Sequence, residues 1–164
     1  MNATLAFVWL LALPLVASAV VYLAGRIGVR AAGTAAPARV LAALTLAACG
    51  VPLWTLGQAV LASGPVTLVV GTVSLRMDAV GLLMAGTVLL LTLVVSLFSV
   101  PYMRREEGEE KYYALLVAMA ASMIGLCSAN DLFNLWVWFE AMAITSFLLV
   151  AFYREQKASL EAGV

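Results

Sequence analysis

One acidic residue, Glu140, stands in the middle of an apolar stretch that runs from Asp131 to Tyr153. At ~1.5 Å rise per residue a helix over this stretch is ~34 Å long, which is enough to cross a hydrocarbon core of about 30 Å, and Glu140 lies ~13 Å from its start. A charged group at that depth costs on the order of 2.5–3.5 kcal/mol on insertion scales, so it is a candidate for ion or proton binding. The alternative is a neutral Glu140 that only hydrogen-bonds a neighbouring helix.

Apolar and aromatic residues fill the neighbouring turns of this helix and favour the neutral form of the Glu140 carboxyl group, as expected for a proton carrier. Ser146, Asp131 and Asp78 are predicted supporting residues of the same path. Each has a structural alternative, because the Ser146 hydroxyl can bond back to its own helix and the two aspartates can cap helices. No other charged residue of the predicted helices lies deep in the membrane.

The composition is typical of an integral membrane protein, because 65% of the 164 residues are hydrophobic and only 11% are charged. A soluble domain carries about 25% charged residues. The formal net charge is +0, which argues against a nucleic-acid partner. With no histidine and two cysteines, Cys49 and Cys127, the chain lacks the ligands of a recognisable metal centre, so we expect no metal and no cofactor in it.

Five long apolar stretches predict an all-α integral membrane fold, arranged as a single membrane domain over residues 1–164. The predicted helices cover residues 3–25, 40–62, 77–100, 112–128 and 131–153. The first stretch contains Ala17-Ser18-Ala19, which is typical of a signal-peptide cleavage site. It has no Lys or Arg before its apolar part, however, and this favours a membrane span.

Three segments between the helices have patterns of their own. Residues 26–39 are predicted to form a basic loop. The segment VTLVVGTVSLR, residues 66–76, is rich in β-branched residues around Gly71 and is too short for a span, so we expect an extended or hairpin segment. The segment 101–111 carries charges of both signs, and we interpret its acids as solvated: Glu106, Glu107, Glu109 and Glu110.

The distribution of basic residues predicts the orientation of the chain in the membrane. If the N-terminus is outside, Arg76 is the one basic residue on the outer side, and the other eight of the 9 Lys and Arg residues are cytoplasmic. These eight are Arg26, Arg30, Arg39, Arg104, Arg105, Lys111, Arg154 and Lys157. We therefore expect residues 131–153 to run from outside to inside.

Three ordered motifs resemble a known family. The run SANDLFNLWVWFEAMAITSFLLVAFYRE, residues 128–155, resembles the antiporter-like, proton-pumping subunits of respiratory complex I, Mrp-type Na+/H+ antiporters and membrane-bound hydrogenases, with Glu140 at the expected spacing from its D-L-F start. Residues 75–81 resemble the family's L-x-x-D-G-L-S motif. Residues 97–103, LFSVPYM, resemble its Y-S-x-x-Y-M motif, although Phe98 stands where a Tyr is usual.

The resemblance covers the N-terminal part of such subunits and implies that Glu140 corresponds to the family's fifth-helix glutamate, which pairs with a lysine of a later helix. It implies a subunit of a multi-subunit, ion-translocating complex in a prokaryotic cytoplasmic membrane, surrounded by lipid. The chain itself would not be catalytic, and redox chemistry of the quinone oxidoreductase or hydrogenase type would belong to partners. The alternatives are a structural, anchoring subunit and the membrane partner of an inorganic-carbon uptake system. The choice between H+ and Na+ stays open.

Overall fold

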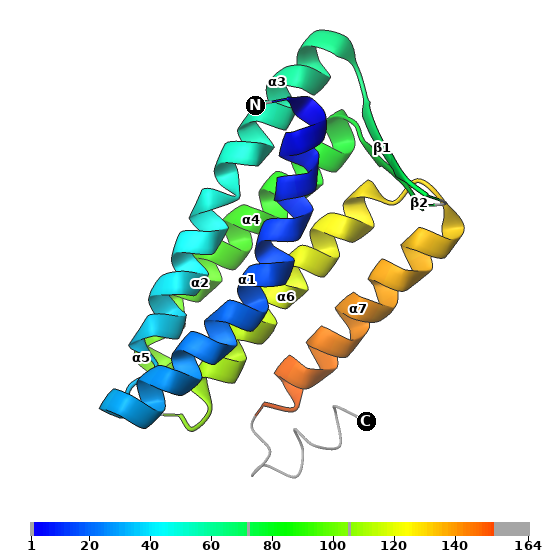
Figure 1. Ribbon diagram of the computed structural model, residues 1–164. Helices are drawn as coiled ribbons and strands as arrows, with labels where there is room; N and C mark the ends of the chain where they lie inside the picture. Colours follow the sequence, from blue (N-terminus) through cyan, green and yellow to red (C-terminus); the bar gives the residue numbers. More distant parts are fainter. Residues whose placement is uncertain (1, 72, 105, 153–164) are drawn as a thin grey trace.

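Long apolar helices lie side by side in the computed structural model of the chain, which describes residues 2–71, 73–104 and 106–152 (Figure 1). In chain order the elements are α1 (Ala3–Ala32), α2 (Ala36–Ala48), α3 (Gly50–Ser63), β1 (Val66–Val70), β2 (Val73–Met77), α4 (Ala79–Phe98), α5 (Val100–Met103), α6 (Glu109–Ser128) and α7 (Leu132–Val150). Within the described residues, five helical segments are long and apolar enough to cross a membrane, with α2 and α3 forming one of them. The predicted all-α, multi-pass membrane fold is confirmed.

The boundary between the first two spans differs from the prediction. Helix α1 continues past Arg26 and Arg30, and the predicted basic loop 26–39 narrows to the residues between Ala32 and Ala36. Arginine is a good helix former, so charge alone does not end a helix. The helix ends instead at Gly33, whose φ of 65° is in the left-handed region and whose N–H donates to the Val29 carbonyl at 3.0 Å.

The second span is interrupted at Cys49, where α2 ends and α3 begins. Pro52 follows in the first turn of α3, and a proline has no N–H to donate to the carbonyl of Ala48 four residues earlier. The helix ladder resumes at once, because the Leu53 N–H donates to the Cys49 carbonyl at 3.1 Å. The interruption of the span therefore lies one turn before the proline.

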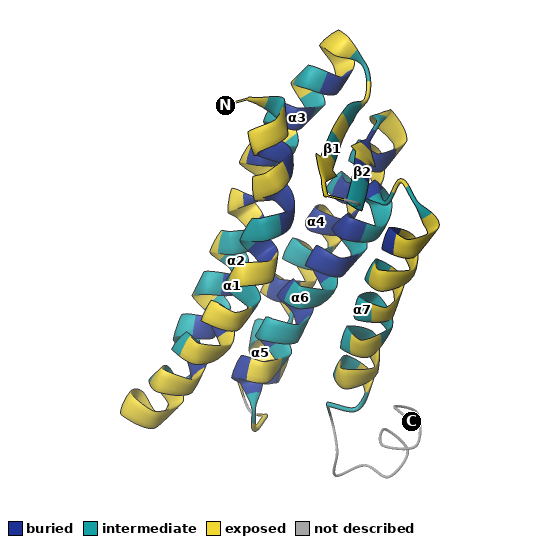
Figure 2. Cartoon of the chain, turned by 45° about the vertical axis from the view of Figure 1, so that its right-hand side comes forward, coloured by how far each residue is buried: buried dark blue, intermediate teal, exposed yellow. Residues whose placement is uncertain are grey.

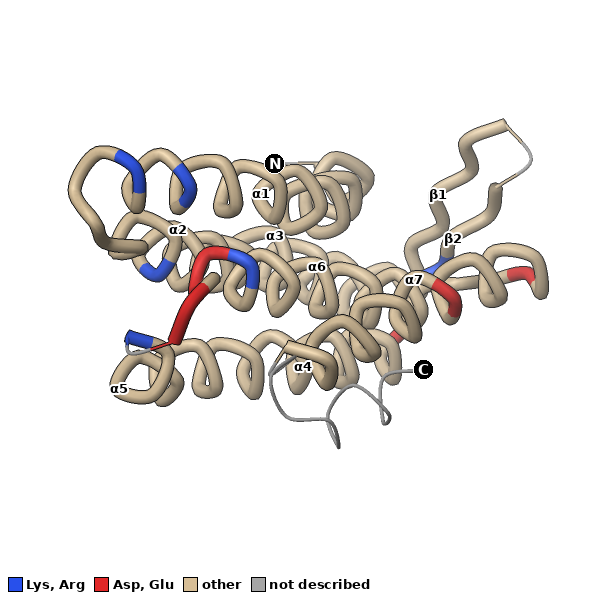
Figure 3. Tube along the Cα trace, turned by 90° about the horizontal axis from the view of Figure 1, so that it is seen from below, with Lys and Arg blue, Asp and Glu red and all other residues tan. Residues whose placement is uncertain are grey.

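The segment after the second span is a β-hairpin, as its β-branched residues predicted. Strands β1 and β2 pair antiparallel, from Val66 opposite Met77 to Val70 opposite Val73. Gly71 starts the turn with a φ of 62°, a conformation that a glycine adopts without strain. Figure 3 shows the hairpin standing out from the helices at the end of the molecule opposite most of the basic residues.

Helix α6 is the central element of the bundle, in contact with α1, α2, α4 and α7 (Figure 1). Its buried side chains include Tyr113, Val117, Ala121 and Ile124, all with an exposed fraction of 0%. Helix α7 has a different environment, since it packs mainly on α6 and most of its outer surface is exposed (Figure 2). The core therefore lies among α1, α2, α4 and α6, and α7 is attached to one side of it.

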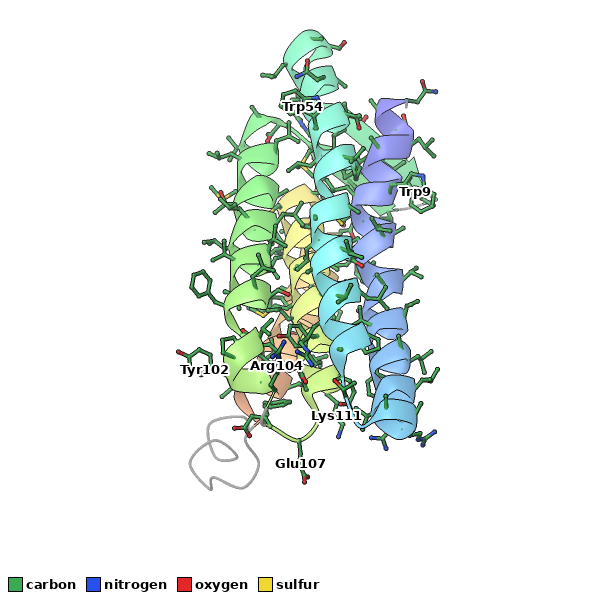
Figure 4. All side chains as sticks on the ribbon, turned by 90° about the vertical axis from the view of Figure 1, so that its left-hand side faces the viewer. Trp9, Trp54, Tyr102, Arg104, Glu107 and Lys111 are labelled. Carbon is green, nitrogen blue, oxygen red and sulfur yellow. The ribbon has the colours of Figure 1, made fainter. Side chains whose placement is uncertain are left out.

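The two ends of the bundle differ in chemistry. In Figure 4, Trp9 and Trp54 lie toward one end, whereas Arg104, Glu107 and Lys111 lie at the other. Basic residues gather on the cytoplasmic side, so the position of Arg104 and Lys111 fits the predicted orientation, whereas tryptophan side chains occur at both membrane interfaces. That orientation, and the single domain over residues 1–164, stay predictions. The predicted helix end at Tyr153 lies outside the described residues, as do Arg105, Arg154 and Lys157.

Candidate functional site

Glu140 lies near the middle of α7, on the side of the helix that faces away from α6. The sequence predicted a buried carboxyl group, but Glu140 is exposed in this chain. The reason is that α7 has one main neighbour, so the face that carries Glu140 is not covered by any described helix. Large exposed side chains surround it on that face: Phe133, Trp136, Ile144 and Phe147. Among the described residues, none forms a hydrogen bond or an ion pair with the Glu140 side chain.

The opposite face of α7 is fixed to α6 by a close contact. The Trp138 ring lies directly over Gly125, so close that any side-chain carbon at position 125 would overlap it. Small residues allow helices in membranes to approach in this way. The indole Nε1 of Trp138 is buried and has no hydrogen-bond partner among the described residues. This contact sets the rotation of α7 and thereby directs Glu140 away from the bundle.

Asp131 and Asp78 are helix caps, as the alternative interpretation of each predicted. Asp131 Oδ1 accepts from the Asn134 N–H at 2.7 Å, and Asp78 Oδ1 accepts from the Gly81 N–H at 2.9 Å. Asp131 also accepts from the Ser74 N–H at 3.4 Å, which joins the start of α7 to strand β2. The Asn134 side-chain amide donates to the Ser74 carbonyl at 3.1 Å and strengthens the same connection.

The structure does not bring the predicted supporting residues together with Glu140. Ser146 donates to the Ala143 carbonyl of its own helix at 2.9 Å. Asp131 lies nine positions before Glu140, or ~13 Å along α7 at the rise of an α-helix. The participation of Glu140, Asp131, Ser146 and Asp78 in an ion path thus stays a prediction.

Two buried acids at the other end of the bundle were interpreted from the sequence as solvated, and that interpretation was wrong. Glu109 and Glu110 form the first turn of α6, with side chains 7% and 3% exposed. Arg39 Nε of α2 lies 2.8 Å from Glu109 Oε1, an ion pair that lacks the geometry of a hydrogen bond. Arg26 Nη1 of α1 lies 3.5 Å from Glu110 Oε1.

Close packing explains why these acids are buried. Gly25 of α1 lets the chain approach Glu110, because a side-chain carbon at position 25 would come within 2.5 Å of the Glu110 Cβ. The extra turns of α1 beyond residue 25 carry Arg26 across from Glu110. The acids were missed because the sequence interpretation ended the first helix too early. With a longer first helix, two features of the sequence would have indicated the pairing. One is Gly25 directly before Arg26, and the other is the acid pair Glu109 and Glu110 at the start of a helix.

A cleft of about 1000 Å³ opens beside these ion pairs. It is bordered by the loop after α1, the segment around Arg104, the first turns of α6 and the C-terminal end of α7. Its lining combines charged side chains with apolar residues such as Leu115, Leu148 and Phe152. Among the described residues no group of three or more metal-ligating side chains occurs, so the cleft offers no recognisable metal centre there.

The described residues thus form a multi-pass membrane fold whose last described span, α7, carries the exposed acid Glu140. The family whose model matches residues 66–113 is described as NADH-ubiquinone oxidoreductase (complex I), chain 5 N-terminus. That match runs from strand β1 to the first turns of α6. The predicted resemblance to the N-terminal part of antiporter-like subunits is confirmed.

Relatives among characterised proteins come from two kinds of complex. The NAD(P)H-quinone oxidoreductase chain 5 of Synechocystis sp. is 31% identical over 72 residues, which are 44% of this chain and 11% of that protein. The Na(+)/H(+) antiporter subunit A1 of Staphylococcus haemolyticus is 33% identical over 67 residues, 41% of this chain and 8% of that protein. The chain thus matches about a tenth of the length of these relatives.

A solved structure has the same fold over nearly the whole chain. One chain of the membrane-bound sulfane sulfur reductase, an archaeal respiratory membrane complex, superposes with a TM-score of 0.75 and 23% identity, covering 96% of this chain and 32% of that chain. At this identity the likeness shows the fold alone. It includes α7, which lies outside the residues matched by the family model.

Proposed function

We propose that this chain is part of an ion-translocating membrane subunit of the complex I and Mrp antiporter type, and that Glu140 binds and releases the translocated proton. The observation that carries the proposal is an ionisable side chain near the middle of a membrane-spanning helix, on a face that no described helix covers. An acid facing lipid is costly, and such residues usually line an ion path or pair with one another. The exposed face of α7 is therefore the side on which the path would run.

The uncovered face also supports an assembly with other membrane subunits or with further helices of the same subunit. Aromatic residues surround Glu140 on that face, and such side chains are common where helices pack. The named relatives are a chain of a quinone oxidoreductase and a subunit of a Na+/H+ antiporter, so H+ movement and Na+/H+ exchange are the two forms of the proposal. Redox chemistry would belong to partner chains, and the location would be a prokaryotic cytoplasmic membrane.

The test replaces Glu140 in the complex purified from native membranes through a tag on this chain. The Glu140→Gln variant keeps the shape and hydrogen bonding of the side chain but removes its titration. Ion translocation should fall severalfold with assembly intact, and Glu140→Asp should restore part of it. Thr87→Val, which removes an exposed polar side chain from the span α4, is the matched control and should leave the rate unchanged.

The same purification identifies the companion chains by mass spectrometry of the intact complex. Flavin, iron–sulfur or hydrogenase chains would point to redox-driven translocation, and antiporter chains alone would point to Na+/H+ exchange. Full translocation by an assembled Glu140→Gln complex would refute the role of Glu140 and would favour an anchoring subunit.

A further inference from the structure

We propose that the cleft at the arginine-rich end is a hydrated vestibule and that Glu109 is the residue that exchanges protons with its water. This inference rests on the proposed function, since a proton-exchange site has a use only in a chain that takes part in ion movement. It concerns the end of the molecule remote from the caps of α4 and α7. It also assigns a role to an acid that neither the sequence motifs nor the comparisons single out.

Glu109 is accessible from the cleft. The cleft has a volume of about 1000 Å³, room for many water molecules, and is open on one side. Glu109 lines it although its side chain is only 7% exposed. A carboxyl group in this position meets water from the cleft and is otherwise enclosed by protein. That combination lets a proton reach the group while limiting the number of routes it can take.

Two buried polar atoms at Glu109 lack a hydrogen-bond partner in the part of the chain that the structure describes. Its Oε1 atom is buried without a hydrogen-bond partner among the described residues, and so is the Nε atom of Arg39 beside it. Buried polar atoms in folded proteins almost always have a partner, which can be an ordered water. These two atoms face each other at 2.8 Å and have almost no accessible surface, so water from the cleft would meet the carboxyl group at its other oxygen, where the proton would be exchanged.

Buried polar groups continue from Glu109 into the bundle. Tyr113 lies one turn further along α6, is fully buried, and has its hydroxyl 3.5 Å from the Ser96 carbonyl of α4. Ser96 is 1% exposed, and its hydroxyl group also lacks a hydrogen-bond partner among the described residues. The next buried side chains along α6, from Leu116 to Ala121, are apolar. Tyr113 and Ser96 therefore form the inner end of the polar region that begins at Glu109.

The charges that face Glu109 permit the exchange. Arg39 of α2 and Arg104 of the segment after α5 act on it as positive charges, and Glu110 of α6 as a negative one. Arg26 of α1 pairs with Glu110 rather than with Glu109. In the charged state the Glu109 carboxylate pairs with Arg39. On uptake of a proton from hydronium in the cleft, the carboxylate becomes a carboxylic acid, water is left behind, and the pair with Arg39 weakens.

The first experiment tests whether the cleft holds water. The two cysteines of this chain are first replaced by alanine (Cys49→Ala and Cys127→Ala). In that background Leu115→Cys should react quickly with a membrane-impermeant thiol reagent added on the arginine-rich side, because Leu115 lines the cleft. Val117→Cys is the matched control, since Val117 is 0% exposed and is absent from the cleft lining. Equal, slow labelling of the two variants would overturn the hydrated vestibule.

The second experiment tests the proton exchange itself. Infrared difference spectra of the assembled complex, recorded on acidification, should show a component of the carboxylic-acid band that is absent in Glu109→Gln and present in Glu107→Gln. A merely structural role of Glu109 would not remove such a band. The Glu109→Gln complex should also translocate ions severalfold more slowly, and Glu109→Asp should recover part of the rate.

The outcomes for Glu109 and Glu140 are separable. A slow Glu140→Gln complex together with a full-rate Glu109→Gln complex that retains the band would refute this inference and leave the proposed function standing. Full rates in both variants would refute the proposed function. A lost band with a full rate would show a titrating carboxyl that lies off the path, and this also overturns the inference.

Discussion

The indole ring of Trp138 rests on the backbone of Gly125, and this contact joins α7 to the rest of the bundle. It lies near the C-terminal end of α6 and in the first half of α7. The hydrogen bonds with Ser74 lie at one end of α7, and the aromatic pair of Tyr112 and Phe152 lies at the other. The ring centroids of that pair are 5.8 Å apart. These three contacts lie along one side of a helix whose other sides no described helix covers.

The glycine at position 125 should be required for this packing. In Gly125→Ala the new side-chain carbon overlaps the Trp138 ring, and overpacking of this kind costs about 1–3 kcal/mol. We expect a lower thermal midpoint for the detergent-purified protein. Gly57→Ala of α3 is the matched control, because a side-chain carbon there meets no atom within 4 Å and alanine favours a helix. Equal midpoints for the two variants would contradict the close contact.

The two ion pairs at the arginine-rich end should contribute differently to the free energy of unfolding. In Arg39→Met the buried Glu109 loses its closest positive charge, and breaking a buried pair on one side costs about 3–5 kcal/mol. Arg26→Met should cost less, because the Arg26 side chain is 45% exposed and its contact is longer. Chemical denaturation in detergent measures both. The double variant Arg39→Met, Glu109→Gln should recover much of the loss, and an unrepaired double variant would argue against the pair.

The cap of α7 should contribute to stability through two hydrogen bonds. Asp131→Ala removes the acceptor for the N–H groups of Asn134 and Ser74, and loss of an N-cap costs about 0.5–2 kcal/mol. Asp131→Asn keeps an acceptor oxygen and should retain most of the stability. Both variants can be measured by hydrogen exchange of the first turn of α7. Protection that is unchanged in Asp131→Ala would show that Asn134 alone holds the helix start.

The predicted orientation can be checked by labelling from each side of the membrane. Ala32→Cys lies at the end of α1 and Ser63→Cys at the end of α3, and both positions are exposed. If the arginine-rich end is cytoplasmic, an impermeant thiol reagent should label Ser63→Cys in intact cells and Ala32→Cys only in inverted vesicles. The reverse pattern would place the N-terminus inside.

Hydropathy was sufficient to predict the spans, because a membrane imposes length and apolarity on each helix separately. The hairpin and the caps at Asp78 and Asp131 were also predictable, since each depends on residues close in sequence. The burial of Glu109 and Glu110 was not predictable in the same way. It depends on α1, whose Arg26 and Gly25 meet α6 only after folding. The exposure of Glu140 likewise depends on which helices surround α7, which no local pattern encodes.

Because α7 is attached on one side only, it can move more easily than the other long helices. A displacement of α6 would disturb contacts with four other helices, whereas a displacement of α7 would mainly disturb contacts with α6. Hydrogen bonds with Ser74 hold its first turn, whereas a ring contact between Phe152 and Tyr112 holds its other end, so α7 is best suited to swing about its first turn, with the largest movement toward Val150. A carboxyl group carried on such a helix can change its surroundings through a tilt of a single element, with the bundle behind it left undisturbed.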